Sequence, residues 1–145
     1  MKKIKILVPL DGTERSMHSL NWLKKFFNKD DVSVTLINVM EALLTDEVMN
    51  PMNPIIGSIP TGFEYLTKDS NLVLDKGIKE LEGYEAYKIS TLGYAADEIL
   101  KISEKDNFDL IIMTKCSKNG LYRLVGSVTS KVVRNAKVAI TVIPD

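Results

Sequence analysis

Two short segments consist almost entirely of large aliphatic residues, and they constrain the fold more than any other feature of this chain. They read DLIIMT at 109–114 and VAITVI at 138–143. Continuous apolar runs of this length are typical of strands that are covered on both faces, as in a parallel sheet. The segments 4–10 and 32–40 are also dominated by Ile, Val and Leu. We therefore predict four buried strands in these positions.

A fifth candidate strand, 84–92, alternates its side chains without being strongly apolar, which is typical of an edge strand. Helical periodicity lies between the strands. The predicted helices cover 14–27, 65–81, 94–105 and 127–136. Thr13 is placed to cap the first helix. Gly77 lies inside the second helix, where glycine costs about 1 kcal/mol relative to alanine, so we expect a close packing contact there.

The order β-α-β-α-β-α-β-α-β predicts one α/β domain over residues 1–145. With right-handed crossovers it gives a doubly wound, five-stranded parallel sheet, and a flavodoxin-like strand order of 3-2-1-4-5 is the default. The segment 41–62 is irregular and contains proline. Irregular segments of this length are usually functional or disordered, so we expect a surface insertion, a lid or a partner-docking loop.

Charge and cysteine content narrow the possible partners and location. Lys plus Arg and Asp plus Glu number 19 each, so no net charge favours nucleic acid or an anionic membrane. No apolar stretch approaches the roughly 20 residues of a membrane span, and the N-terminal residues do not resemble a signal peptide. The single cysteine, Cys116, excludes an internal disulfide and a multi-cysteine metal site. We expect a cytoplasmic protein.

A binding site is expected where the strand order reverses, at the carboxyl ends of the strands. Asp11 follows the first strand there and can either accept hydrogen bonds from the following turn or contact a ligand. Gly126 and Ser127 open the last helix, whose first amides attract anions. Ser127 can contact a phosphate or simply cap the helix. Neither a Walker A loop nor a Rossmann glycine pattern is present.

Catalytic residues are hard to assemble from this sequence. His18 is the sole histidine, lies early in a helix and is expected to be a surface or packing residue. No Gly-x-Ser-x-Gly nucleophile motif occurs. Lys115 and Lys118 lie close to Cys116, but we expect its thiol to be inert. We therefore predict no catalytic residues and no metal site.

Four stretches resemble the universal stress protein family in their order and spacing. They are KIKILVPLDGTERS at 3–16, SVTLINV at 33–39, LGYAADEILKISEKDNFDLIIM at 92–113 and GSVTSKVVRNAKVAITVIPD at 126–145. The resemblance covers nearly the whole chain except about 41–83. It implies a flavodoxin-like fold, a role in the stress response with a protein partner that stays unknown, and homodimers that pair their last strands. The implied interface consists of Ala139, Ile140, Thr141, Val142 and Ile143.

The family includes members that bind ATP through Gly-x2-Gly-x9-Gly-Ser/Thr and members that do not. Counting back from Gly126-Ser127 places Met113 and Cys116 where ATP binders have glycines. The residues at the positions of the family's nucleotide site are Pro9, Asp11, Val39, Met113, Cys116, Gly126, Ser127 and Val128. We expect a binding protein with weak or no ATP binding and no other cofactor. An ATP- or AMP-binding sensor and a slow ATP hydrolase are the alternatives.

Overall fold

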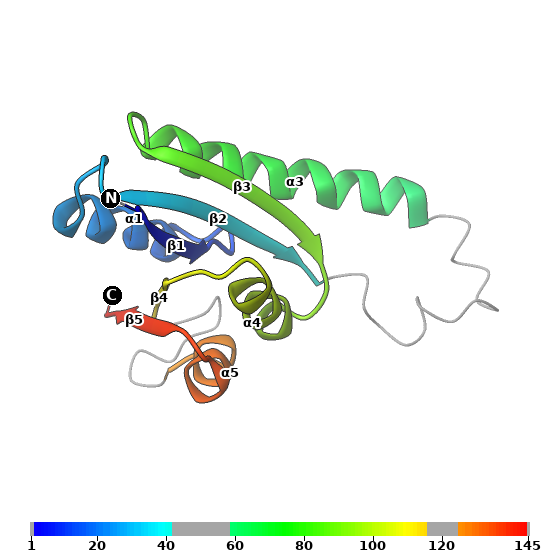
Figure 1. Cartoon of the computed structure of the whole chain (residues 1–145). Helices are drawn as coiled ribbons and strands as arrows, with labels where there is room; N and C mark the ends of the chain where they lie inside the picture. Colours follow the sequence, from blue (N-terminus) through cyan, green and yellow to red (C-terminus); the bar gives the residue numbers. More distant parts are fainter. Residues whose placement is uncertain (1, 42–58, 116–124, 145) are drawn as a thin grey trace.

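The computed structural model describes residues 2–41, 59–115 and 125–144, in which strands and helices alternate (Figure 1). The elements are β1 (Ile4–Pro9), α1 (Glu14–Phe26), β2 (Val32–Met40), α3 (Ile59–Glu80), β3 (Glu85–Leu92), α4 (Ala95–Lys105), β4 (Leu110–Thr114), α5 (Ser127–Asn135) and β5 (Ala139–Ile143). The predicted strands and helices are confirmed, and with one exception their ends differ from the predicted ends by at most one residue.

The exception is α3, which begins at Ile59 rather than at 65. The prediction that 41–62 is irregular is therefore wrong for its last residues, and 42–58 lie outside the described residues. Pro60 is the second residue of this helix. Proline is tolerated in a first helical turn because the amide that it lacks has no acceptor within the helix. Proline was thus a poor sign of loop structure at this position.

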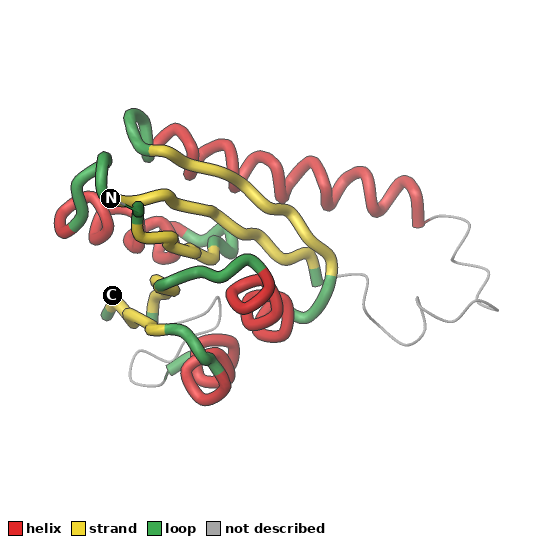
Figure 2. The backbone as a smooth tube through the Cα atoms, in the orientation of Figure 1, coloured by secondary structure: helices red, strands yellow, loops and turns green. Residues whose placement is uncertain are grey.

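The five strands form one parallel sheet in the order β3-β2-β1-β4-β5, which confirms the predicted doubly wound topology. Helices α1 and α3 pack on one face of the sheet, and α4 and α5 pack on the other (Figure 2). The alternating strand is an edge strand as predicted, and β5 forms the opposite edge. Among helices built from the described residues, none is both long and apolar enough to cross a membrane.

The continuous apolar runs are explained by two hydrophobic cores, one on each face of the sheet. Ile6 and Val8 of β1 belong to the core beneath α1 and α3, whereas Leu7 belongs to the core beneath α4 and α5. In β4, Ile112 lies in the first core and Ile111 in the second. Successive side chains of a strand point to opposite faces, so a strand covered on both faces needs apolar residues at every position.

Gly77 allows α3 to lie close to the sheet. A Cβ atom at this position would lie 2.6 Å from Leu36 Cδ1 and 2.7 Å from Leu10 Cδ1, both of which belong to the core. The close contact predicted from the glycine is therefore confirmed. This approach also sets the position of α3 beside the carboxyl ends of β1 and β2, where the helix contributes one wall of a cleft.

Candidate functional site

A cleft of about 940 Å³ opens at the carboxyl ends of β1, β2 and β4. Its walls come from the segment after β1, the end of β2, the middle of α3 and the first residues of α4 and α5. The volume lies in the range of small-molecule pockets, and the position is the switch point of the sheet, where β1 is flanked by β2 and β4. The predicted site residues that line it are Pro9, Asp11, Val39, Met113, Ser127 and Val128.

Three other residues discussed as candidates from the sequence are not among the described residues that line the cleft. Gly126 immediately precedes the lining residues Ser127 and Val128 but is not itself part of the lining. Cys116 lies outside the described residues. His18 is exposed on α1 and does not line the cleft, in agreement with its interpretation as a surface residue.

Asp11 organises the turn between β1 and α1. Its Oδ1 accepts hydrogen bonds from the Thr13 amide, at 2.9 Å, and from the Thr13 hydroxyl. Thr13 in turn caps α1, because its Oγ1 accepts from the Ser16 amide at 3.3 Å. The structural role considered for Asp11 is therefore present. Its second oxygen, Oδ2, accepts no hydrogen bond from the described residues, so a ligand contact is compatible with the same geometry.

Gly12 makes this turn possible. Its φ of +85° lies in a region that side chains rarely adopt, and a Cβ atom would also lie 3.3 Å from Val73 Cγ2 on α3. Glycine has no Cβ and enters this region without the usual steric cost. The carboxylate of Asp11 can therefore reach Thr13 while the backbone turns into α1.

The start of α5 is held against the end of β4. The Gly126 amide donates to the Lys115 carbonyl at 2.9 Å, and Thr129 Oγ1 donates to the Thr114 carbonyl at 3.0 Å. Gly126 occupies the N-cap position, so the alternative in which Ser127 caps the helix is wrong. Ser127 is instead the first helical residue, and its side chain is exposed at the cleft. Among the described side chains, none accepts a hydrogen bond from the first-turn amides.

Met113 fills part of the cleft wall with a side chain. It lies in β4 opposite Val142 and is 5% exposed, packed in the core beneath α4 and α5. Among the described non-glycine residues, positive φ occurs only at Asn107, so Met113 has ordinary strand geometry. The missing glycine therefore imposes no backbone strain at this position. Its effect on a ligand arises from the volume of the methionine side chain.

Several lining residues carry chemistry that we did not single out from the sequence. Asn38 Nδ2 donates to the Leu10 carbonyl at 2.7 Å and so joins the ends of β2 and β1. Glu41, just after β2, accepts from the Ala95 amide at 2.6 Å through Oε1 and thereby caps α4. Glu41 could have been assigned to the cleft from the sequence, because it is an acidic residue at the end of a predicted strand. No sequence pattern indicated Asp69, because the length of the segment after β2 leaves open where α3 packs against the sheet.

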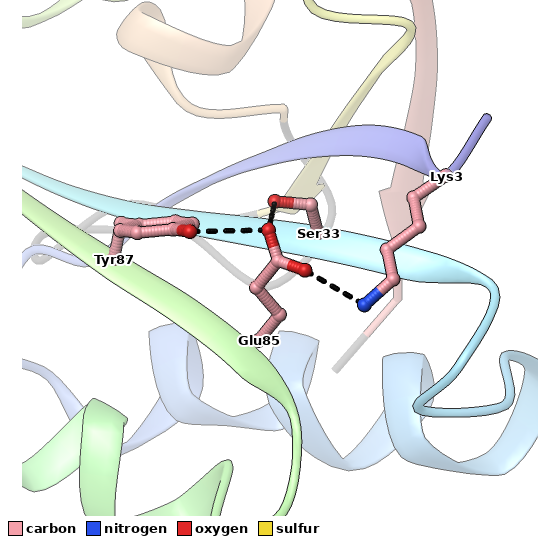
Figure 3. A network of polar contacts seen from close by, with 4 residues as sticks. All are labelled: Lys3, Ser33, Glu85 and Tyr87. Carbon is pink, nitrogen blue, oxygen red and sulfur yellow. Dashed lines mark hydrogen bonds and ion pairs between the residues drawn. The ribbon is translucent and has the colours of Figure 1, made fainter.

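Among the described residues, the ionisable groups with shifted pKa values lie near the amino ends of the strands, at the end of the sheet opposite the cleft (Figure 3). Glu85 accepts from Lys3 Nζ at 2.7 Å, from Ser33 Oγ at 3.0 Å and from the Tyr87 hydroxyl at 3.1 Å. The bond from Lys3, followed by those from Ser33 and Tyr87, lowers the pKa of Glu85. Hydrogen bonding to Glu85 raises the pKa of Lys3 and of Tyr87. This network connects the start of β3 to β2 and to the residue before β1, and it is separate from the cleft.

Within residues 2–41, 59–115 and 125–144, no three His, Cys, Asp or Glu residues are grouped so that they could hold a metal ion. The carboxylates of Asp11 and Glu41 each bind a backbone amide near the start of a helix. Their positions identify them as supports of the cleft walls.

Comparison with known proteins agrees with the fold. The pattern that defines the Universal stress protein family matches residues 4–144. The chain belongs to this family. Universal stress protein MJ0531 from Methanocaldococcus jannaschii is 30% identical over an alignment of 151 positions, which spans 96% of this chain and 81% of the relative.

Two solved structures of relatives extend the comparison. Protein MJ0577 of the same organism has a TM-score of 0.82 and 27% identity, covering 99% of this universal stress protein and 96% of the other chain. An Arabidopsis thaliana universal stress protein solved with bound AMP has a TM-score of 0.70 and 14% identity, covering 97% and 90% of the two chains. At that level of identity, the second likeness concerns the fold alone.

Proposed function

We propose that this universal stress protein acts in the stress response by reversible binding, without catalysis, and that its cleft binds an adenine nucleotide with weak affinity for ATP. The observation that carries the proposal is the meeting of Asp11, Val39 and Ser127 in one cleft at the switch point of the sheet. The AMP-bound relative from Arabidopsis thaliana supports the choice of an adenine nucleotide. We further propose a cytoplasmic location, in keeping with the single cysteine.

The lining suggests how the ligand would lie. Half-buried Val39 at the end of β2 and buried Ile99 on α4 provide an apolar region for a base. The second oxygen of Asp11 is available to a ribose hydroxyl. A phosphate would lie at the start of α5, where the amides of Ser127 and Val128 carry the partial positive charge of a helix N-terminus.

Weak affinity for ATP is expected from the wall at Met113. ATP-binding members have a glycine at that position, whereas this side chain is packed in the wall beside Val128. Forcing additional atoms against a packed group typically costs about 1–3 kcal/mol.

Calorimetric titration of the purified protein with AMP and ATP, with and without Mg²⁺, tests this function. A matched pair of variants on α5 identifies the site. Val128→Trp places a large side chain in the cleft, whereas Val133→Trp changes a residue that is 51% exposed and outside the lining. We expect Val128→Trp to abolish AMP binding and Val133→Trp to preserve it. No heat with AMP at millimolar concentration, or equal binding by the two variants, would refute the proposed site.

A phosphate-release assay tests the absence of catalysis. We expect no turnover of ATP above the rate without protein. ATP hydrolysis by the wild type that disappears in Val128→Trp but persists in Val133→Trp would show that the cleft is catalytic. The alternative of a slow ATP hydrolase would then replace the binding function.

We propose that the protein forms a homodimer through β5. This strand is an edge of the sheet, with β4 on one side, and Ile140 and Val142 are only half-buried. An apolar edge strand exposes backbone groups that readily pair with another strand. Ile140→Lys should convert the dimer to a monomer in light scattering coupled to size-exclusion chromatography, while Val133→Lys should not. A wild-type monomer, or an Ile140→Lys dimer, would contradict this interface.

A further inference from the structure

The cleft contains negative side chains and no described positive ones. Asp11 follows β1, Glu41 follows β2, and Asp69 projects from α3, and all three line the cleft. Among the described lining residues there is no Lys, Arg or His. Sites that hold several phosphates usually pair them with cationic side chains or a metal ion. The described side chains of this cleft therefore oppose the accumulation of negative charge by its ligand.

The helix starts at the cleft differ in their capacity to hold an anion. At α1, the Asp11 carboxylate lies behind the Thr13 cap and accepts from its amide at 2.9 Å. At α4, the Glu41 carboxylate accepts from the Ala95 amide at 2.6 Å. A carboxylate at these positions uses the partial positive charge that would otherwise attract a ligand phosphate.

The start of α5 is different because its N-cap is Gly126, which has no side chain. Ser127, the first residue of this helix, is exposed at the cleft. Of the three helix starts that the described residues place at the cleft, that of α5 is left for a ligand anion, whereas carboxylates lie at those of α1 and α4. A second or third phosphate would lie in the field of three carboxylates without an equivalent partner among the described residues.

We infer that the cleft selects its ligand by charge and favours a nucleoside monophosphate over the corresponding diphosphate and triphosphate. This inference rests on the proposed nucleotide site and names the class of nucleotide that the site takes. ATP carries about two more negative charges than AMP at neutral pH. Repulsion between like charges is weakened by salt, with a screening length of about 8 Å at physiological ionic strength. Charge selection therefore predicts both an order of affinities and a salt dependence.

The direct test is calorimetric titration with adenosine, AMP, ADP and ATP in the absence of divalent cations, at low and at high salt. We expect AMP to bind more tightly than ADP, and ADP more tightly than ATP. Added salt should reduce the preference for AMP over ATP, because it screens the repulsion felt by the additional phosphates. Adenosine should be insensitive to salt. A cleft that binds ATP more tightly than AMP under these conditions would overturn the inference.

Neutralising one carboxylate provides a second test. Asp69→Asn removes a charge from the lining, and Asp75→Asn on the same helix is the matched control, since Asp75 lies outside the lining and pairs with Lys88. At a carboxylate–phosphate separation of about 8 Å in screened water, Coulomb's law gives a gain of about fourfold for ATP and about twofold for AMP. Adenosine should bind Asp69→Asn and the wild type equally.

Glu41→Gln extends this test to a carboxylate at a helix start. Its amide oxygen can still accept from the Ala95 amide, so the cap is retained while the charge is removed. ATP affinity should increase more than AMP affinity, as for Asp69→Asn. An equal change for adenosine, AMP and ATP in both variants would overturn charge selection while leaving the proposed function intact. Absence of binding by all four ligands would overturn both.

Discussion

Met113→Ala should destabilise the protein while improving nucleotide binding. The Met113 side chain is 5% exposed and belongs to the core beneath α4 and α5, yet it also lines the cleft. Replacing a buried methionine by alanine usually costs 2–5 kcal/mol, and the loss depends on whether the vacated space can be filled. Because the cleft adjoins this side chain, water can enter the vacated space. We therefore expect Met113→Ala to lower the free energy of unfolding by about 2 kcal/mol, near the lower end of this range.

Ile112→Ala is the matched control for this change. Ile112 is the preceding residue of β4, is 0% exposed and belongs to the core on the opposite face, away from the cleft. Its replacement removes the same number of non-hydrogen atoms but leaves a cavity sealed by α1 and the sheet. We expect it to cost about 4 kcal/mol, near the upper part of the same range.

Urea unfolding followed by circular dichroism gives the free energies of unfolding of Met113→Ala and Ile112→Ala. Calorimetry on the folded variants gives their affinities for AMP. If the methionine restricts the cleft, its removal should strengthen AMP binding by about 1 kcal/mol, roughly fivefold, whereas Ile112→Ala should leave it unchanged. Unchanged or weaker AMP binding by Met113→Ala would refute the steric explanation. A Met113→Ala variant as stable as the wild type would refute its assignment to the core.

Three further changes test the fold itself. Gly77→Ala should lower the free energy of unfolding by about 1 kcal/mol in urea titrations, because a Cβ atom 2.6 Å from Leu36 Cδ1 outweighs the gain in helix propensity; a more stable variant would contradict the close contact. Gly12→Ala should cost about 1–2 kcal/mol, since its φ of +85° is unfavourable for alanine, and an unchanged urea midpoint would argue against that turn geometry. Glu85→Gln should lower the melting temperature at pH 7 but not at a pH below the native pKa of Glu85. Because the pKa of Glu85 is lowered from its ordinary value of 4.5, this carboxylate stabilises the fold at pH values above 4.5, and the effect is lost as the pH falls through its native pKa. A difference in melting temperature that does not depend on pH would contradict the contribution of Lys3.

The central strands were predictable because they are covered on both faces and therefore need apolar residues at nearly every position. The run at 109–114 shows this most clearly, with Ile111 and Ile112 in different cores. The start of α3 was not predictable from the same rules. Pro60 is compatible with both a loop and a first helical turn, and neighbouring side chains do not distinguish the two.

The candidate site was predictable in part. Asp11 follows a strand and Ser127 opens a helix after a strand. Their positions in the chain therefore already place them at the carboxyl ends of the strands of a parallel sheet. Glu41 directly follows the second predicted strand and could be placed at this end of the sheet in the same way. Asp69 was not assigned to the cleft, because α3 follows the long segment after β2 and its return to the sheet has no local signature. The consequence of Met113 also required the structure, which shows a packed side chain in ordinary strand geometry.

The sequence by itself determined the family, the parallel sheet, its strand order and the end of the sheet where a ligand would bind. The family follows from the resemblance of four stretches of sequence, whereas the features of the sheet follow from hydrophobic periodicity and from the order of strands and helices. All of these can be read along the chain without knowledge of its tertiary contacts. Only the tertiary structure decided which side chains share the cleft and which helix start is left for an anion. Those properties depend on contacts such as Glu41 Oε1 to the Ala95 amide, between residues 54 positions apart, which no local pattern encodes.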